Sequence, residues 1–398
     1  MSGQGAEGVP LLENALKGTS GQDRAWVLLE LGNWIWQAGQ PEGLEMVVEA
    51  AALFEEFDCD HGVARARYEQ ARMLCDRGTF GQAQILLDQA LPVHRARGDR
   101  RSEGMCLGQS AIIAKRTARL ADARDLYERA LAIHLELGDR RLAAGVLGNL
   151  ANVDMEQGEF EVAEERLNRS LRMHREIGQH GTVGLRLGNL GNLHQLRGDL
   201  DQARAFHRQA LVIHRELGRR RLEALTLGNL AHVEARIEPT PVSQARKSVL
   251  VAAFEEAGRL HDLVGAPSGR SIVMANLGGF LLRIGERDEA RRVLDDALSI
   301  AIGSKAAILT AIFGGIRALL DDDLATALER LDQGEATLRG ACARYELALL
   351  LARRARVLQS HGDPERAAAA KAHARGIAGD VPWGERSELA ELLTGGAM

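Results

Sequence analysis

The feature that most restricts the fold of this chain is a sequence repeat of 40 residues. The phrase LGQS begins at residue 107, and LGNL begins at residues 147, 187 and 227. Repeats of roughly 20–50 residues are typical of solenoids, in which each unit buries its apolar face only against its neighbours. We therefore expect the 398 residues to form one long repeat array and not a set of unrelated globular domains.

Each repeat is predicted to be a pair of antiparallel helices. In the segment 181–217, apolar and small residues first recur at i, i+3, i+4 and i+7, which is the spacing of one helix face. Gly198-Asp199 ends this pattern and gives the next helix a candidate N-cap. The two faces comprise Leu187, Leu190, Gly191 and His194, and then Ala203, His207, Ala210, Leu211 and His214. Because only 4% of the residues are aromatic, the composition also favours helices over strands.

These residues resemble the signature of the tetratricopeptide repeat, which has Leu-Gly on its first helix and two alanines around a bulky residue on its second. The Trp and Tyr of that signature are replaced here. The unit of 40 residues is similar to the repeats of Pins-type spindle adaptors, kinesin light chains and many bacterial regulators. The resemblance implies an all-α fold, namely a tetratricopeptide-type right-handed superhelical solenoid of about nine helical hairpins with a C-terminal capping helix.

The repeats divide the chain into five predicted segments. One alanine of the second helix recurs at Ala83, Ala123, Ala163, Ala203, Ala245, Ala290, Ala327 and Ala367. The spacing of 40 slips by seven residues after Arg236, where EPTP (238–241) and DLVGAPSGR (262–270) indicate loops. We expect an N-terminal cap segment in 1–21, a regular array in 22–236, an irregular unit with inserted loops in 237–270, further repeat units in 271–379, and a capping helix and tail in 380–398.

The sequence contains no recognised motif for catalysis. A GxxxxGK[ST] phosphate loop, an HExxH zinc helix, a GxSxG nucleophile elbow and a dinucleotide-binding glycine motif are all missing. The candidate metal ligands are His94, His134, His174 and His214, one in each of four repeats. Neighbouring repeats lie about 10 Å apart, so single histidines at this spacing do not meet at one ion. We predict no enzyme, no catalytic residue, no cofactor and no metal. The histidines are expected to pack near helix ends, where a protonated ring would favour the helix dipole.

Charge and cysteine content predict a cytosolic protein that binds neither nucleic acid nor membrane. The formal net charge is -5, so there is no basic excess. Arginines cluster at turns, in 100–101, 140–141 and 219–221, and we interpret them as a solvated edge. The four cysteines form no CxxC pair, the N-terminus does not resemble a signal peptide, and no apolar run approaches the roughly 18 residues of a membrane helix. The oligomeric state is not indicated.

The candidate binding residues form a stripe on the first helices. Asn149, Asn189, Asn229 and Asn276 share one repeat position, and Asn152, Asn192 and His232 lie three residues after the first three of them. Residues three apart on a helix share a face, whereas Gly191 points into the packing seam. First helices line the concave surface of tetratricopeptide arrays, and the resemblance implies that asparagines at these positions bind the backbone of a peptide. An amide suits this role because it both donates and accepts. The alternative is that the amides bond to local backbone or face water.

Two functions are predicted from this stripe. The first is a non-enzymatic scaffold or adaptor that binds an extended peptide segment of a protein partner in its concave groove. The alternative is a bacterial regulatory sensor whose groove binds a short signalling peptide or small molecule and changes shape. A third interpretation makes the chain the repeat part, or a derivative, of a larger kinase, cyclase or ATPase regulator.

Overall fold

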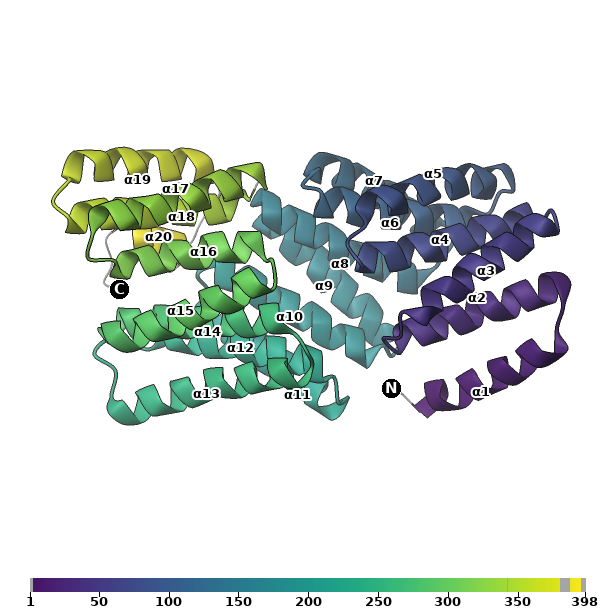
Figure 1. Cartoon of the computed structure of the whole chain (residues 1–398), viewed down its shortest axis with the longest axis horizontal. Helices are drawn as coiled ribbons and strands as arrows, with labels where there is room; N and C mark the ends of the chain where they lie inside the picture. Colours follow the sequence, from purple (N-terminus) through teal and green to yellow (C-terminus); the bar gives the residue numbers. More distant parts are fainter. Residues whose placement is uncertain (1–2, 342, 380–386, 395–398) are drawn as a thin grey trace. The chain divides into compact units, whose positions relative to one another are not determined.

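The computed structural model describes residues 3–341, 343–379 and 387–394 of the chain (Figure 1). These residues form twenty α-helices and one short 3-10 helix, and none of them lies in a β-strand. The chain divides into two compact units, Met1–Val153 and Asp154–Met398, each of which contains buried apolar clusters of its own.

The first unit is a row of helix pairs that follows an N-terminal helix. Helix α1 packs against α2, and the pairs α2–α3, α4–α5 and α6–α7 pack within themselves. The last turn of α8 belongs to the second unit. The helices are α1 (Gly3–Gly18), α2 (Gly21–Gln37), α3 (Glu42–Glu56), α4 (Asp60–Asp76), α5 (Phe80–Ala96), α6 (Arg100–Arg116), α7 (Leu120–Glu136) and α8 (Arg140–Gln157).

The second unit continues the same arrangement. Its helices are α9 (Phe160–Glu176), α10 (His180–Arg197), α11 (Leu200–Glu216), α12 (Arg220–Ile237), α13 (Gln244–Leu263), α14 (Pro267–Arg283), α15 (Arg287–Gly303), α16 (Ala307–Arg317), the 3-10 helix η1 (Ala318–Leu320), α17 (Leu324–Gly340), α18 (Arg344–Ser360), α19 (Pro364–Ala378) and α20 (Glu388–Thr394). No helix in the described parts of the chain is long and apolar enough to span a membrane.

The order of the helices confirms the predicted solenoid of helical hairpins. From α2 to α19, the described residues contain nine consecutive pairs, in which an even-numbered first helix precedes an odd-numbered second helix. Helix α20 is the C-terminal helix, and only 387–394 of the predicted segment 380–398 lie within the described residues. The division into five segments stays a prediction.

A small residue on the first helix sets how closely the two helices of a pair approach. Gly191 of α10 is buried, and a Cβ added to it would lie 2.5 Å from the imidazole Cε1 of His207 in α11. Gly278 of α14 meets Leu294 of α15 in the same way, with a Cβ contact of 2.6 Å. Side-chain atoms do not approach so closely, so these pairs require glycine at the seam. We call this position the seam residue.

The turns between successive pairs explain the repeated Gly-Asp. Gly98 has a φ of 68°, which is left-handed backbone that glycine adopts without strain. The next N–H, of Asp99, donates to the carbonyl of His94 at 2.9 Å and closes the helix end. The Asp99 carboxylate then accepts the Ser102 N–H at 3.1 Å and so caps the following helix. The segment Gly-Asp-Arg-Arg (98–101) therefore ends α5 and starts α6.

One of the two predicted irregular loops is absent. Helix α13 continues to Leu263 and α14 begins at Pro267, so the phrase DLVGAPSGR (262–270) contains only a short turn at 264–266. The inserted residues lie in 238–243, and α13 is itself extended to 20 residues. The prediction of a loop at 262–270 is therefore wrong. Its proline stands in the first turn of a helix, where the missing N–H costs no hydrogen bond.

The histidine row is buried. His94, His134, His174 and His214 are at most 2% exposed. Burial disfavours the charged ring and lowers the pKa of all four imidazoles. The predicted packing role is confirmed, since the ring of His134 lies 2.6 Å from where a Cβ of Gly104 would stand. These rings are thus packing groups whose charged form is disfavoured by burial.

We expect Gly191→Ala to destabilise the second unit by about 1–3 kcal/mol, because the added methyl group must displace the buried ring of His207. Gly188→Ala on the same helix is the matched control, since a Cβ there has no atom within 4 Å. Alanine forms helices better than glycine, so the control should be neutral or stabilising by up to about 1 kcal/mol. Urea unfolding followed by circular dichroism measures both variants. Equal midpoints would contradict the close seam.

The stability of the second unit should decrease as the pH falls from about 6.5 toward 4. Burial lowers the pKa of His207 to about 4, so between these values the unfolded chain binds more protons than the folded chain. The contribution of His207 is therefore complete above about pH 6.5 and is lost by about 1.4 kcal/mol per pH unit below it. His207→Phe should flatten the pH dependence of the urea midpoint, whereas substitution of the exposed His180 by Gln should leave it unchanged. Identical slopes for both variants would refute this origin.

Candidate functional site

The predicted binding stripe lies beside the packing seam. On α10, Asn189 and Asn192 flank the pair Leu190-Gly191, and both amides are half-buried while the seam residue is fully packed. The other predicted residues have similar intermediate exposure: Asn149 and Asn152 on α8, Asn229 and His232 on α12, and Asn276 on α14. The stripe is therefore partly accessible at every predicted position.

Two of the predicted residues contact each other directly. The Nδ2 of Asn229 donates to the Oδ1 of Asn192 at 3.0 Å. This hydrogen bond joins the first helices α10 and α12 of adjacent repeats, so the stripe is continuous across that boundary. Asn149 and Asn152 belong to the first unit, and the others belong to the second. Ligand binding by the seven predicted residues stays a prediction.

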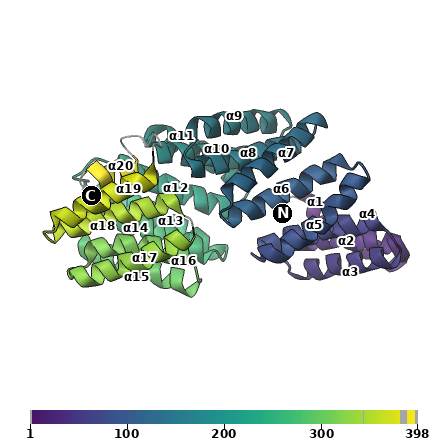
Figure 2. The ribbon, with the colours of Figure 1, turned by 90° about the horizontal axis from the view of Figure 1, so that it is seen from above.

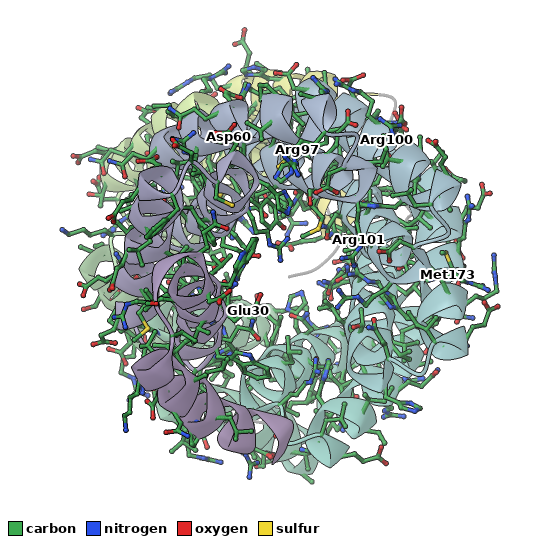
Figure 3. The ribbon with its side chains drawn as sticks, turned by 90° about the vertical axis from the view of Figure 1, so that its right-hand side faces the viewer. Glu30, Asp60, Arg97, Arg100, Arg101 and Met173 are labelled. Atoms are coloured by element: carbon green, nitrogen blue, oxygen red, sulfur yellow. The ribbon has the colours of Figure 1, made fainter. Side chains whose placement is uncertain are left out.

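In the first unit, the same position faces the inner side of the helix row. Glu30 precedes Leu31-Gly32 on α2, as Asn189 precedes its own Leu-Gly. Glu30 is exposed, and Figure 3 shows it pointing toward the inner side of the ribbon of this unit. Asn33, three residues later, accepts a hydrogen bond from Nη2 of Arg72 at 2.9 Å. The two stripe positions are thus polar here as well.

Arginines occupy the stripe on α18, which the sequence analysis missed. Arg353 and Arg356 flank the fully buried seam residue Ala355, in the same way as the two asparagines flank the seam glycine of α10. The signal was present in the sequence, because the seam residue lies twelve residues before the recurring second-helix alanine, here Ala367. It was missed because only the asparagines and the aligned His232 were considered as stripe residues.

These arginines and α12 hold the C-terminal helix through its glutamates. Nη2 of Arg353 donates to Glu388 at 2.6 Å. Nη2 of Arg236, one turn beyond the stripe on α12, donates to Glu391 at 2.9 Å. The guanidinium groups of Arg353 and Arg236 have side-chain exposures of 4% and 10%, so these ion pairs are shielded from water on the arginine side.

The same surface also binds the backbone of α20. Nη2 of Arg356 donates to the carbonyl of Glu391 at 2.7 Å, and its Nε donates to the carbonyl of Leu392 at 3.4 Å. Leu389 and Leu392 are 0% and 2% exposed and belong to the apolar cluster around α18. A stripe side chain therefore contacts main-chain oxygens of another segment of the chain.

The bridge formed by α20 shows which side of the second unit is concave. Helices α12 and α18 are three pairs apart, which would separate them by about 30 Å in a straight stack at 8–10 Å per helix. Helix α20 has seven residues and is only about 10 Å long. Helix α20 packs against α18, and the side chains of Arg236 and Glu391 link it to α12, so the row of first helices curves and brings α12 closer to α18. Figures 1 and 2 show α20, in yellow, beside α18.

The surface of α12 and α18 that contacts α20 favours a bound carboxylate electrostatically. Burial by itself would raise the pKa of Glu388, but the positive charges of Arg353 and Arg236 hold it below its usual value. Burial, with the nearby Arg236 and Arg283, lowers the pKa of His232 to about 4. The predicted site residue His232 is therefore a neutral ring at neutral pH, and the positive charge of the surface comes from arginine.

The repeats match a known family. Residues 105–176 and 141–213 each match the family model described as Tetratricopeptide repeat. Residues 105–213 of the chain therefore consist of tetratricopeptide repeats. No curated protein matches its sequence.

Solved structures with low sequence identity share this tetratricopeptide fold. A Rap protein complexed with competence and sporulation factor has 15% identity and a TM-score of 0.64, with 90% of this chain and 98% of that chain covered. The Rap conjugation gene regulator of the plasmid pLS20, in complex with the Phr* peptide, has 14% identity, a TM-score of 0.60 and coverages of 84% and 96%. Aspartyl phosphate phosphatase F from Bacillus subtilis has 12% identity, a TM-score of 0.60 and coverages of 92% and 96%. At these identities the similarity shows the fold alone.

Three side chains in the first unit of this tetratricopeptide array come together as possible metal ligands. His61, His94 and Asp99 each place one ligand atom within 4.8 Å of the others. In the following repeat, Arg101 holds the place of His61 and donates to the capping Asp139 at 2.9 Å. The histidine thus replaces an arginine in the polar network that joins successive repeats. This repeat-wide role explains the cluster, and the absence of a metal stays a prediction.

The arginines at the turns are paired with acidic side chains of the tetratricopeptide helices. Arg100 lies 2.6 Å from Glu103 and 3.2 Å from Glu136, and Figure 3 labels it together with Arg101. Arg220 lies 3.3 Å from Glu223 in the same manner. The arginines are exposed, whereas the side chains of Glu103 and Glu223 are only 8% and 6% exposed. That the arginines form only a solvated edge stays a prediction.

A cleft of about 830 Å³ lies elsewhere in the second unit, between α15, α16 and α17. Its walls include Leu298, Ile302, Thr310, Arg330 and Thr337. No stripe position borders it, and its walls come mainly from two second helices. The first-helix surface that holds α20 is therefore the stronger candidate for the binding site of this tetratricopeptide protein.

We expect Arg353→Ala combined with Arg356→Ala to release α20. Hydrogen bonds to charged groups contribute about 1.5–3 kcal/mol each, so losing them should raise amide exchange in 388–394 by at least about tenfold. Hydrogen-exchange mass spectrometry measures this. The control is Arg287→Ala combined with Arg292→Ala, two exposed arginines of α15. Unchanged exchange in α20 with the first pair would contradict the contacts described above.

Proposed function

We propose that this tetratricopeptide protein is a non-enzymatic adaptor or regulator that binds a peptide segment of a partner on the inner face of its first helices. The observation that carries the proposal is Arg356, a stripe residue that donates to two backbone carbonyls of another segment of the chain. Binding of main-chain groups at this repeat position is the role proposed for the asparagines. We place this function in the cytosol.

The asparagine stripe suits an extended ligand. An extended peptide advances about 3.3 Å per residue, and first helices follow one another at about 10 Å, so each helix meets the ligand about every third residue. Asn192 and Asn229 already satisfy each other across one such step. A ligand backbone, which carries both donors and acceptors, can replace that mutual bond without leaving either amide unsatisfied. Such a site holds a peptide by its main chain and leaves sequence preference to flanking side chains.

A sensor of signalling peptides is the second candidate function. Two of the structural neighbours are complexes, one with competence and sporulation factor and one with the Phr* peptide, and their fold is the one found here. In a sensor, ligand binding changes the shape of the solenoid, whereas an adaptor requires no such change. Small-angle scattering with and without a ligand separates the two.

We retain a non-enzymatic role although one structural neighbour is named a phosphatase. Glu30 occupies the stripe position in the first unit, whereas the stripe residues named in the second unit are His232, amides and arginines, and amides and arginines bind but do not transfer protons at neutral pH. A general base works best with a pKa near 7, and burial lowers the pKa of His232, the titratable member, to about 4. These residues support binding and not acid–base chemistry.

A peptide ligand that is selected from a library by its binding to the full chain tests the stripe. Asn189→Ala combined with Asn192→Ala should weaken binding by one to a few kcal/mol, at about 1 kcal/mol for each lost hydrogen bond. Isothermal titration calorimetry measures the affinity. Asn168→Ala on the second helix α9 is the control and should not change it. Full affinity in the double variant, with unaltered helix content, removes the stripe as the binding site.

A further inference from the structure

The surface that holds α20 has a definite chemical preference. We infer that the inner face of α12 and α18 is a docking site for an acidic, leucine-containing helical segment of a partner protein, and that α20 is its internal occupant. This inference rests on the proposed function and specifies the ligand class for one part of the inner face. The argument comes from what α20 presents and from what receives it.

Helix α20 presents two carboxylates and two leucines in a helical pattern. Glu388 and Glu391 are three residues apart, and so are Leu389 and Leu392. On a helix, each pair lies on one face and the two faces are adjacent. The glutamates reach Arg353 and Arg236, while the leucines are buried. The receiving surface therefore matches the pattern Glu-Leu-x-Glu-Leu in helical form.

The receiving surface is built to keep its arginines in place. Arg283 of α14 donates to the backbone carbonyls of Ala235 and, at 2.9 Å, of Glu238, and so fixes the end of α12 that carries Arg236. Arg353 of α18 is 3% exposed with α20 in place, where it donates to Glu388. Arginine forms directional bonds with carboxylates and carbonyls alike. The solenoid thus fixes the backbone from which Arg236 extends to α20.

The intrinsic affinity of α20 for the surface of α12 and α18 is expected to be low. It has seven residues, which is too short for a stable helix in water, so its helical form depends on docking. Glu391 keeps 44% of its side chain exposed, so its ion pair with Arg236 is weaker than a fully buried pair. What favours α20 is its covalent attachment, which gives it an effective concentration on the order of millimolar. A partner segment with the same pattern and a longer helix has more contacts to offer and displaces it.

The test uses the full chain and a fluorescein-labelled peptide with the sequence of residues 387–394, SELAELLT, which includes the N-cap Ser387. Glu388→Arg combined with Glu391→Arg repels α20 from the arginines and empties the surface. By fluorescence anisotropy, this variant should bind the peptide at least about tenfold more tightly than the wild type, in which attached α20 competes. Adding Arg353→Glu and Arg356→Glu should abolish the binding.

Two controls keep the result specific. Glu165→Arg combined with Glu216→Arg makes the same charge change on exposed residues of α9 and α11 and should behave as wild type. A peptide of the same composition with its glutamates adjacent should bind neither variant. Circular dichroism and thermal midpoints establish that each variant is folded.

The inference is overturned if the wild type and the emptied variant bind the peptide with equal affinity. It is also overturned if the emptied variant binds no peptide up to about 1 mM, because covalent attachment supplies an effective concentration only in that range. The proposed function fails separately. If a library-selected peptide still binds and depends on Asn189 and Asn192, the inner face binds peptides and only the assignment of α12 and α18 to acidic helices is wrong.

Discussion

The contact between the seam residue of a first helix and the second helix of its pair determines both the fold and the site. At Gly191 the approach is so close that the ring of His207 occupies the space of a Cβ. This contact fixes the rotation of α10 about its own axis. Once that rotation is fixed, the residues two before and one after the seam residue must lie on the exposed inner side. The stripe is thus a geometric consequence of the packing.

Because packing fixes the stripe positions but not the residues in them, their chemistry varies along the chain. Glu30 occupies the position on α2, asparagines occupy it in the middle of the array, and Arg353 occupies it on α18. Acidic, amide and basic groups therefore follow one another on first helices with nearly the same backbone. A solenoid of this kind can change its ligand preference from repeat to repeat without changing its core, since each repeat contacts only its neighbours.

Helix α20 is bound on the inner face by Arg356 and Arg236. Arg356 corresponds to an asparagine of the stripe, and it donates to two carbonyls of α20. Arg236 reaches Glu391 across 155 positions of sequence. Both side chains are thus binding groups with an occupant from the same chain. This explains why buried guanidinium groups are kept on a face that also carries apolar contacts to Leu389 and Leu392.

The sequence by itself determined the helical hairpins, their number, the seam residues and the stripe on α10 and α12, because these depend on spacings within one repeat. It misplaced a loop at 262–270, because proline is equally compatible with a turn and with the start of a helix. It placed the histidines near helix ends but could not show how deeply they are buried, because burial depends on the neighbouring helix. Only the tertiary structure decided where α20 lies and that Arg353 and Arg356 bind it. That contact joins segments far apart in the chain through the curvature of the whole row, and local spacing carries no information about curvature.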